Sequence, residues 1–172
     1  MNQTINLANL VDICEGITGR KKLQKIVHLL QEFGHIDDFG YDFGYLHYGP
    51  YSRSLRDDLD LLVGCVPPII AEQSELAGAH ETFKYAPSAG LREALNGAGV
   101  NDTPPWKSLA RKLNALAPQK LEAMSTIRFL SHQGFDGAAL KERFAMLKPS
   151  LASQFDSAVS DLRSFTVQDV SA

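Results

Sequence analysis

The clearest pattern of hydrophobic and polar positions lies in residues 20–33, where apolar side chains recur every three or four positions. This spacing puts them on one face of a helix. The apolar side chains are Leu23, Ile26, Val27, Leu30 and Phe33. The pattern predicts an amphipathic helix over 20–33 that ends at Gly34, because glycine readily adopts the left-handed conformation that closes helices.

Two further helices are predicted on either side of this one. Residues 4–14 carry apolar side chains at helical spacing, with Thr4 placed as an N-cap. Residues 52–65 repeat the pattern, and Ser52 or Ser54 is expected to cap that helix. The three helices supply the apolar faces needed for one core.

Short strands are predicted between and after these helices. The stretch 41–48 is dense in Tyr and Phe and favours a strand, after a turn at 37–40. Gly49-Pro50 is expected to bend the chain, because proline fixes its own φ and restricts the residue before it. Residues 66–70 and 82–86 predict two strands of a hairpin with a long polar tip.

A short helix from Ser88 to about Gly97 completes the first part of the chain. Helices followed by a helix and a β-hairpin are typical of a winged helix domain, which we place at 1–96. Residues 97–105 are rich in Gly and Pro and predict a linker, and Trp106, which follows two prolines, is expected to anchor that linker on the core. Four helices near 106–116, 118–132, 136–147 and 149–165 predict a helical subdomain at 106–166, with a tail at 167–172. The fold class is therefore α+β and mostly helical.

Composition and charge narrow the functional classes. The 172 residues are 44% hydrophobic, the formal net charge is −3, and the first 86 residues hold 7 basic and 12 acidic side chains. A domain that grips duplex DNA mainly through phosphates is usually basic overall, so a nucleic-acid role would need a local patch. No signal peptide and no run of about 18 apolar residues is visible, which predicts a cytoplasmic protein that does not enter a membrane.

One local basic patch exists at the start of the helix over 20–33, formed by Arg20, Lys21, Lys22 and Lys25. Bases at a helix start oppose the macrodipole, which favours acids there. The four side chains are candidates for contact with phosphates or with an acidic partner surface. A solvated helix face explains the same pattern.

A second candidate site is the corner around Gly49-Pro50, which presents Tyr48, Tyr51, Arg53 and Arg56 near a helix start. Tyr and Arg are enriched at binding hot spots, and a helix N-terminus attracts anions. A structural turn whose two tyrosine rings pack on the core is the alternative. The acids in the helix that follows, at 57, 58 and 60, favour a protein partner over DNA, unless they form an ordinary solvated face.

No catalytic or metal-binding arrangement is visible. Ser52 lacks the G-x-S-x-G context of a nucleophile elbow, and no His or acid has a spacing that indicates a triad. The five histidines show no metal-ligand spacing, and no Gly-rich phosphate loop is present. We therefore expect no enzymatic activity, no cofactor and no metal site.

Three stretches carry a family resemblance: KLQKIVHLLQ at 22–31, YGPYSRSLRDDLDLL at 48–62 and LKPSL at 147–151. With FKYAPSAG at 83–90, they resemble the YwgA-like bacterial and archaeal proteins and, more distantly, the Panacea antitoxin group. The sequence departs from the pattern at His28, where Tyr is usual, and at Pro87, where Leu is common. The resemblance implies a shared fold and, for Panacea members, neutralisation of a toxin.

The leading functional expectation is a non-enzymatic protein-interaction module, either antitoxin-like or an adaptor subunit. Its partner would be a toxin, a protease or a subunit encoded in the same operon, and a homodimer is also compatible with the sequence. The alternative is a winged-helix transcriptional regulator that binds DNA.

Overall fold

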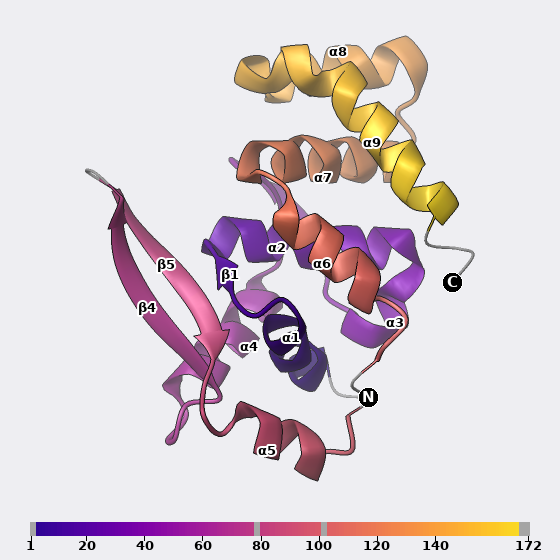
Figure 1. Cartoon of the computed structure of the whole chain (residues 1–172). Coiled ribbons are helices and arrows are strands. Elements are labelled where there is room, and N and C mark those ends of the chain that lie inside the picture. The colour runs from indigo at the N-terminus through magenta and orange to yellow at the C-terminus, as the bar shows by residue number, and fades with distance from the viewer. Residues whose placement is uncertain (1–2, 78–79, 101–102, 169–172) are drawn as a thin grey trace.

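The computed structural model is a mostly helical α+β protein with small antiparallel sheets (Figure 1). It describes residues 3–77, 80–100 and 103–168. None of the helices in this described part is both long and apolar enough to span a bilayer. The fold class predicted from the hydrophobic pattern is confirmed at this level.

The first three predicted helices are present. They are α1 (Gln3–Ile13), α2 (Arg20–Leu30) and α4 (Arg53–Gly64). Helix α1 begins one residue before Thr4, so the predicted N-cap role is wrong, and the Thr4 hydroxyl instead donates to Asp58. Ser52 does cap α4, because its Oγ accepts from the Leu55 N–H.

The chain turns after α2 through a wide helical turn, η1 (Gln31–His35). Gly34 has φ 104°, so the predicted positive-φ glycine is confirmed here. The next four residues form a short helix, α3 (Ile36–Phe39), where the sequence predicted only a turn, and Gly40 closes it in the left-handed conformation. The buried ring of Phe39 anchors this helix in the core.

The aromatic stretch forms a hairpin rather than one strand. Its strands are β2 (Gly44–Leu46) and β3 (Gly49–Tyr51), paired antiparallel with Leu46 opposite Gly49. The prediction of a strand over 41–48 followed by a bend at Gly49-Pro50 is therefore wrong. The turn falls at residues 47–48, and Pro50 lies within a strand of a two-stranded sheet, where an edge position needs no N–H.

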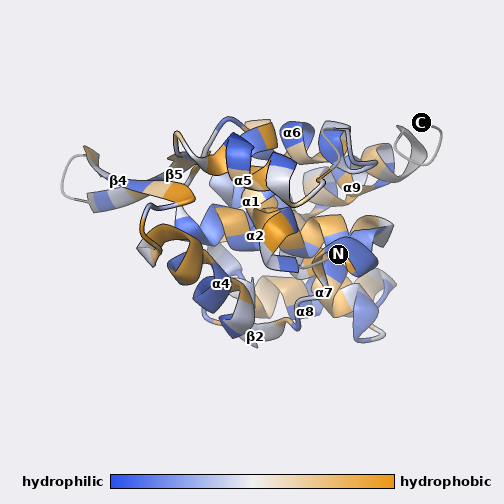
Figure 2. Cartoon of the chain, turned by 90° about the horizontal axis from the view of Figure 1, so that it is seen from below, coloured by the Kyte–Doolittle hydropathy of each residue, from blue (hydrophilic) through white to orange (hydrophobic). Residues whose placement is uncertain are grey.

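The second hairpin is longer than the sequence indicated, and its first strand begins only at Ile70, so the predicted strand over 66–70 is wrong for residues 66–69. Strands β4 (Ile70–Ala77) and β5 (His80–Pro87) pair along their whole length, and β1 (Ile17–Thr18) adds to β5. The segment expected as a loose polar tip is therefore mainly strand, and the tip residues 78–79 lie outside the described residues. Figures 1 and 2 both show this hairpin projecting from the helical body.

The remaining helices follow the predicted pattern closely. They are α5 (Leu91–Gly97), α6 (Lys107–Ala115), α7 (Pro118–His132), α8 (Gly137–Leu147), the 3-10 turn η2 (Pro149–Gln154) and α9 (Phe155–Gln168). Helix α6 packs on α1 and α2, α7 packs on α2, and α8 and α9 cover α7 as an outer layer (Figure 1).

One hydrophobic core runs through these layers. It includes side chains from α1, α2, α4, α6, α7 and α9, and Figure 2 shows apolar positions of these helices turned inward. Trp106, predicted as an anchor after the linker, is fully buried with its ring 5.2 Å from that of Phe39. The division into 1–96 and 106–166 stays a prediction, and residues 101–102 of the linker and 169–172 of the tail lie outside the described residues.

Candidate functional site

The β2–β3 hairpin is held on α2 by side chains that bond to its backbone. The Gln24 amide accepts from the Ser52 N–H and donates to the Ser52 carbonyl, both at 2.9 Å. Seven residues further along the chain, Gln31 at the start of η1 makes the same pair of bonds to Tyr41, at 3.0 and 2.9 Å. Each glutamine therefore pairs with the backbone N–H and C=O of a residue that flanks the hairpin, as a neighbouring strand would.

Two lysines complete this attachment. Lys25 Nζ donates to the Pro50 carbonyl at 2.6 Å, and Lys148 Nζ donates to the His47 carbonyl at 3.0 Å. Lys148 also pairs with Glu122 of α7. We call Gln24, Lys25, Gln31 and Lys148 the polar seam; it joins α2, the hairpin and the end of α8.

Burial of Lys25 corrects the prediction of an exposed basic cluster. Only 3% of Lys25 is exposed, and burial lowers the pKa of its ammonium from 10.5 to about 8. Glu122 partly offsets that fall, and Lys148 and Lys21 add to it. Lys25 is therefore a structural ligand of the hairpin backbone.

The hairpin also approaches α7 closely at Gly49. A Cβ added there would lie 2.9 Å from Thr126 Oγ1, and the residue has φ +90°. Glycine is required on both counts. Nearby, the imidazole of His28 is buried, its Nδ1 lies 3.0 Å from Ser125 Oγ, and burial lowers its pKa to about 3, so it is neutral at pH 7.

A small pocket opens where the start of α2, the hairpin and α4 meet. Its volume is about 220 Å³. Leucines from all three elements line it, together with two tyrosines and four bases, and none of the lining residues is acidic. The lining side chains and glycine are Arg20, Lys21, Leu23, Gln24, Lys25, Leu46, His47, Tyr48, Gly49, Tyr51, Arg56 and Leu59.

Six of the eight predicted site residues lie at this pocket, and Lys22 and Arg53 do not. Lys22 donates to the Asn114 carbonyl near the end of α6, and burial lowers its pKa. Arg53 lines a separate hollow beside Asp42 and Tyr45. The basic cluster therefore points in several directions instead of forming one patch.

Arg20 is held firmly at the pocket rim. Its guanidinium donates to Tyr85 and pairs with Glu72 of β4 at 3.0 Å and with Asp60 of α4 at 3.2 Å. These three partners fix Arg20 between the long hairpin and α4. Because one guanidinium is shared by two carboxylates, Arg20 adds no net positive charge to the pocket rim.

Lys21 and Arg56 are exposed and less constrained. The Lys21 ammonium lies 3.1 Å from the centroid of the Tyr48 ring, and no ion pair joins Lys21 to a carboxylate within the described residues. Arg56 pairs with its neighbour Asp57 at 2.6 Å and also interacts with Tyr51. An ion pair this exposed to water contributes little to stability, so a ligand can displace it at low cost.

The acids of α4 do not form a free acidic face. Asp58 accepts from Thr4 and from the Tyr41 hydroxyl, at 2.9 and 2.8 Å, and Asp60 pairs with Arg20. The alternative of an ordinary solvated face for all three acids therefore does not hold for Asp58. It serves instead as a structural acceptor between α1, α4 and the segment before β2.

The pocket therefore combines an apolar floor, tyrosines and the exposed cations Lys21 and Arg56. Ligand sites for drug-sized molecules have volumes of roughly 300–1,000 Å³, so this pocket suits one large side chain better than a nucleotide. Among residues 3–77, 80–100 and 103–168, no group of three His, Cys, Asp or Glu side chains is placed to hold a metal ion.

Sequence reasoning missed the seam and the apolar floor. Gln24, Gln31 and Lys148 lie in the motifs used for the family resemblance, and Gln24 and Gln31 are spaced by seven residues along the chain. That heptad spacing of glutamines on an apolar helix face was the available signal. No sequence pattern indicated that Leu46 and Leu59 lie together at the pocket floor, because their proximity depends on where the hairpin turns.

Fold and site together define a mostly helical α+β protein with a basic-rimmed apolar pocket. The chain is similar to the uncharacterized protein YwgA of Bacillus subtilis (strain 168), with 29% identity over 132 residues, which cover 77% of this chain and 75% of YwgA. No protein-family model matches the chain. The similarity supports a YwgA-like relationship.

Proposed function

We propose that the protein is a non-enzymatic interaction module, either an adaptor or an antitoxin-like subunit, that binds a protein partner at the pocket between α2, α4 and the β2–β3 hairpin. The observation that carries this proposal is the convergence of exposed Lys21, Tyr48 and Arg56 on an apolar floor with no acid in its lining. Tyr and Arg are enriched among residues that dominate binding energy.

We also propose a winged helix for the first part of the chain. The order α1, β1, α2, α4, β4, β5 and the sheet order β1-β5-β4 support it. In that fold α4 would be the helix offered to a DNA major groove. Its exposed side chains include Arg53 and Arg56 but also Asp57 and Asp60. Equal numbers of acids and bases favour a protein partner over phosphates.

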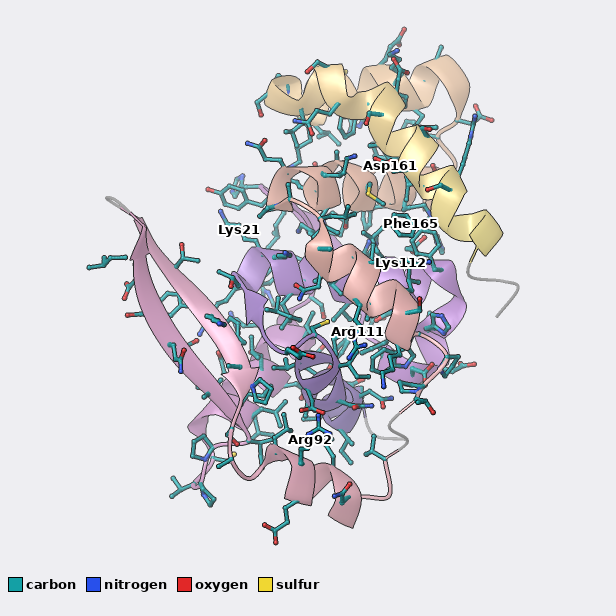
Figure 3. The ribbon with its side chains drawn as sticks, in the orientation of Figure 1. Lys21, Arg92, Arg111, Lys112, Asp161 and Phe165 are labelled. Atoms are coloured by element: carbon teal, nitrogen blue, oxygen red, sulfur yellow. The ribbon has the colours of Figure 1, made fainter. Side chains whose placement is uncertain are left out.

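The test is affinity purification of the tagged chain from the organism that encodes it, at moderate salt and with nuclease treatment. We expect a stoichiometric protein that survives nuclease and is lost from a Lys21→Glu/Arg56→Glu variant. Lys112→Glu is the matched control, because Lys112 is exposed on α6, away from Lys21 (Figure 3). Retention of the partner by the double variant would exclude this surface.

Loss of all bound material with nuclease would instead support the DNA-binding regulator. In that case binding to duplex DNA should weaken steeply with salt, and Arg53→Ala should weaken it as well.

A further inference from the structure

The charge at the start of α2 is unfavourable in the free protein. Arg20, Lys21 and Lys22 occupy the first turn, no acid lies there, and the N-cap residue Gly19 offers no side-chain cap. A helix start carries partial positive charge, so each exposed base there is destabilising. A bound anionic group would relieve this repulsion.

The cations that can meet such a group are Lys21 and Arg56. Arg20 is already bonded to Glu72, Asp60 and Tyr85, so it positions the rim and is not available to a ligand. Lys21 contacts the Tyr48 ring, and Arg56 pairs with the exposed carboxylate of Asp57 beside Tyr51. Both cations lie beside the apolar floor.

The floor fits one apolar side chain. Leu23 and Leu59 are buried beneath it, while 47% of Leu46 and 55% of Tyr48 are exposed beside it. A dry cavity of about 150 Å³ is large enough to bind benzene, so about 220 Å³ accommodates an aromatic or large aliphatic side chain. Covering Leu46 and Tyr48 would remove further apolar surface from water.

Resting on the interaction function proposed above, we propose that the pocket binds a short acidic segment of the partner, with one large apolar side chain on the floor and a neighbouring carboxylate at Lys21 and Arg56. The apolar side chain supplies the anchor, and the carboxylate takes the place of Asp57 and of the Tyr48 ring as partner of the cations. Charge complementarity selects an acidic segment, because the lining contributes bases and no acids.

The probe is a library of random peptides displayed on phage and selected on the immobilised full chain. We expect enriched peptides to share a Phe, Leu, Ile or Trp with Asp or Glu within two positions. Synthetic copies, measured by fluorescence anisotropy, should bind at least roughly tenfold more weakly to Lys21→Glu and to Arg56→Glu, because a like charge then faces the carboxylate. Leu46→Glu should weaken binding as well, and Lys112→Glu should bind as the wild type does.

Three results would overturn the proposal: no enrichment, enrichment of basic peptides, or equal binding of the selected peptides to the pocket variants and the wild type. Thermal melting of each variant separates loss of binding from loss of fold. If the natural partner depends on Lys21 and Arg56 while the peptides fail, the interaction function stands and only the acidic segment is rejected.

Discussion

The polar seam and the pocket share helix α2 and the same hairpin but differ in what their residues contact. In the seam, Gln24 and Lys25 are buried and bond to backbone groups. At the pocket, Lys21 and Tyr48 are exposed and contact each other. Lys21 and Lys25 are one helical turn apart, yet Lys25 is structural and Lys21 is available to a ligand.

This difference changes how the family resemblance should be interpreted. The motif residues in KLQK and YGPYS bond to one another across the seam: Gln24 to Ser52 and Lys25 to Pro50. Lys148 of LKPSL bonds to the same hairpin. The motifs therefore specify how the hairpin is attached to the helices, and the binding properties depend on exposed residues beside them.

The largest expected effect comes from breaking the seam at Gln24. Gln24→Met keeps the size of the side chain but removes both bonds to Ser52. The buried N–H of Ser52 is then left without a partner. An unsatisfied buried donor costs about 1–3 kcal/mol in addition to the lost bonds, so we expect a loss of about 3–4 kcal/mol in the free energy of unfolding. Urea denaturation measures it. The control Gln119→Met, at an exposed position of α7, should stay within about 0.5 kcal/mol.

The longer helices were predictable because each carries a local pattern of apolar positions, whereas the four-residue α3 is too short to show one. The spacing of apolar side chains located α2, α4 and the helices from α6 to α9 to within a few residues. Trp106 was correctly expected to anchor the chain after the linker, because a large aromatic beside two prolines has few other roles.

The hairpins and the pocket depend on contacts between distant segments, and the sequence alone located them poorly. The turn of β2–β3 falls at residues 47–48 because Lys25, Lys148 and Thr126 fit around Gly49-Pro50, and those three come from different helices. Local propensity at Gly49-Pro50 favoured a bend at that position instead. Six of the eight candidate residues nonetheless lie at one pocket, because the two motifs that contain them are neighbours in space.

The second prediction tests the burial of Lys25 in the seam through the pH dependence of the free energy of unfolding. Because burial lowers its pKa from 10.5 to about 8, the unfolded chain binds more protons than the folded chain between those values. Stability relative to a Lys25→Met variant should therefore rise with pH across that window, by about 3 kcal/mol in total. Urea denaturation of both proteins at several pH values measures this difference in the free energy of unfolding. The opposing contributions of Cys14 and the buried tyrosines are common to both proteins and cancel in the difference.

A flat difference between pH 8 and 10.5 would mean that Lys25 reaches water.

A smaller effect is expected where the hairpin meets α7. Gly49→Ala places a methyl group 2.9 Å from Thr126 Oγ1 at a residue with φ +90°. A positive φ costs a residue with a Cβ about 1–2 kcal/mol, and the close contact adds to it, so we expect a loss of about 2 kcal/mol. Gly44→Ala, in the paired strand with nothing within 4 Å of its Cβ position, should change stability by less than about 0.5 kcal/mol. Equal losses at both glycines would contradict the close approach.

The smallest effect on stability is expected at Lys21, where the largest effect on binding is proposed. Lys21→Glu loses the contact with the Tyr48 ring, worth about 0.5–1 kcal/mol at an exposed site. It also places an acid in the first turn of α2, where the macrodipole favours it by about 0.3–1 kcal/mol. The two changes offset each other, so thermal unfolding should be unchanged within about 0.5 kcal/mol while partner binding is lost. A variant that lost stability and binding together would show that Lys21 belongs to the seam, whereas separate effects would establish that α2 uses one turn to attach the hairpin and the adjacent turn to bind a partner.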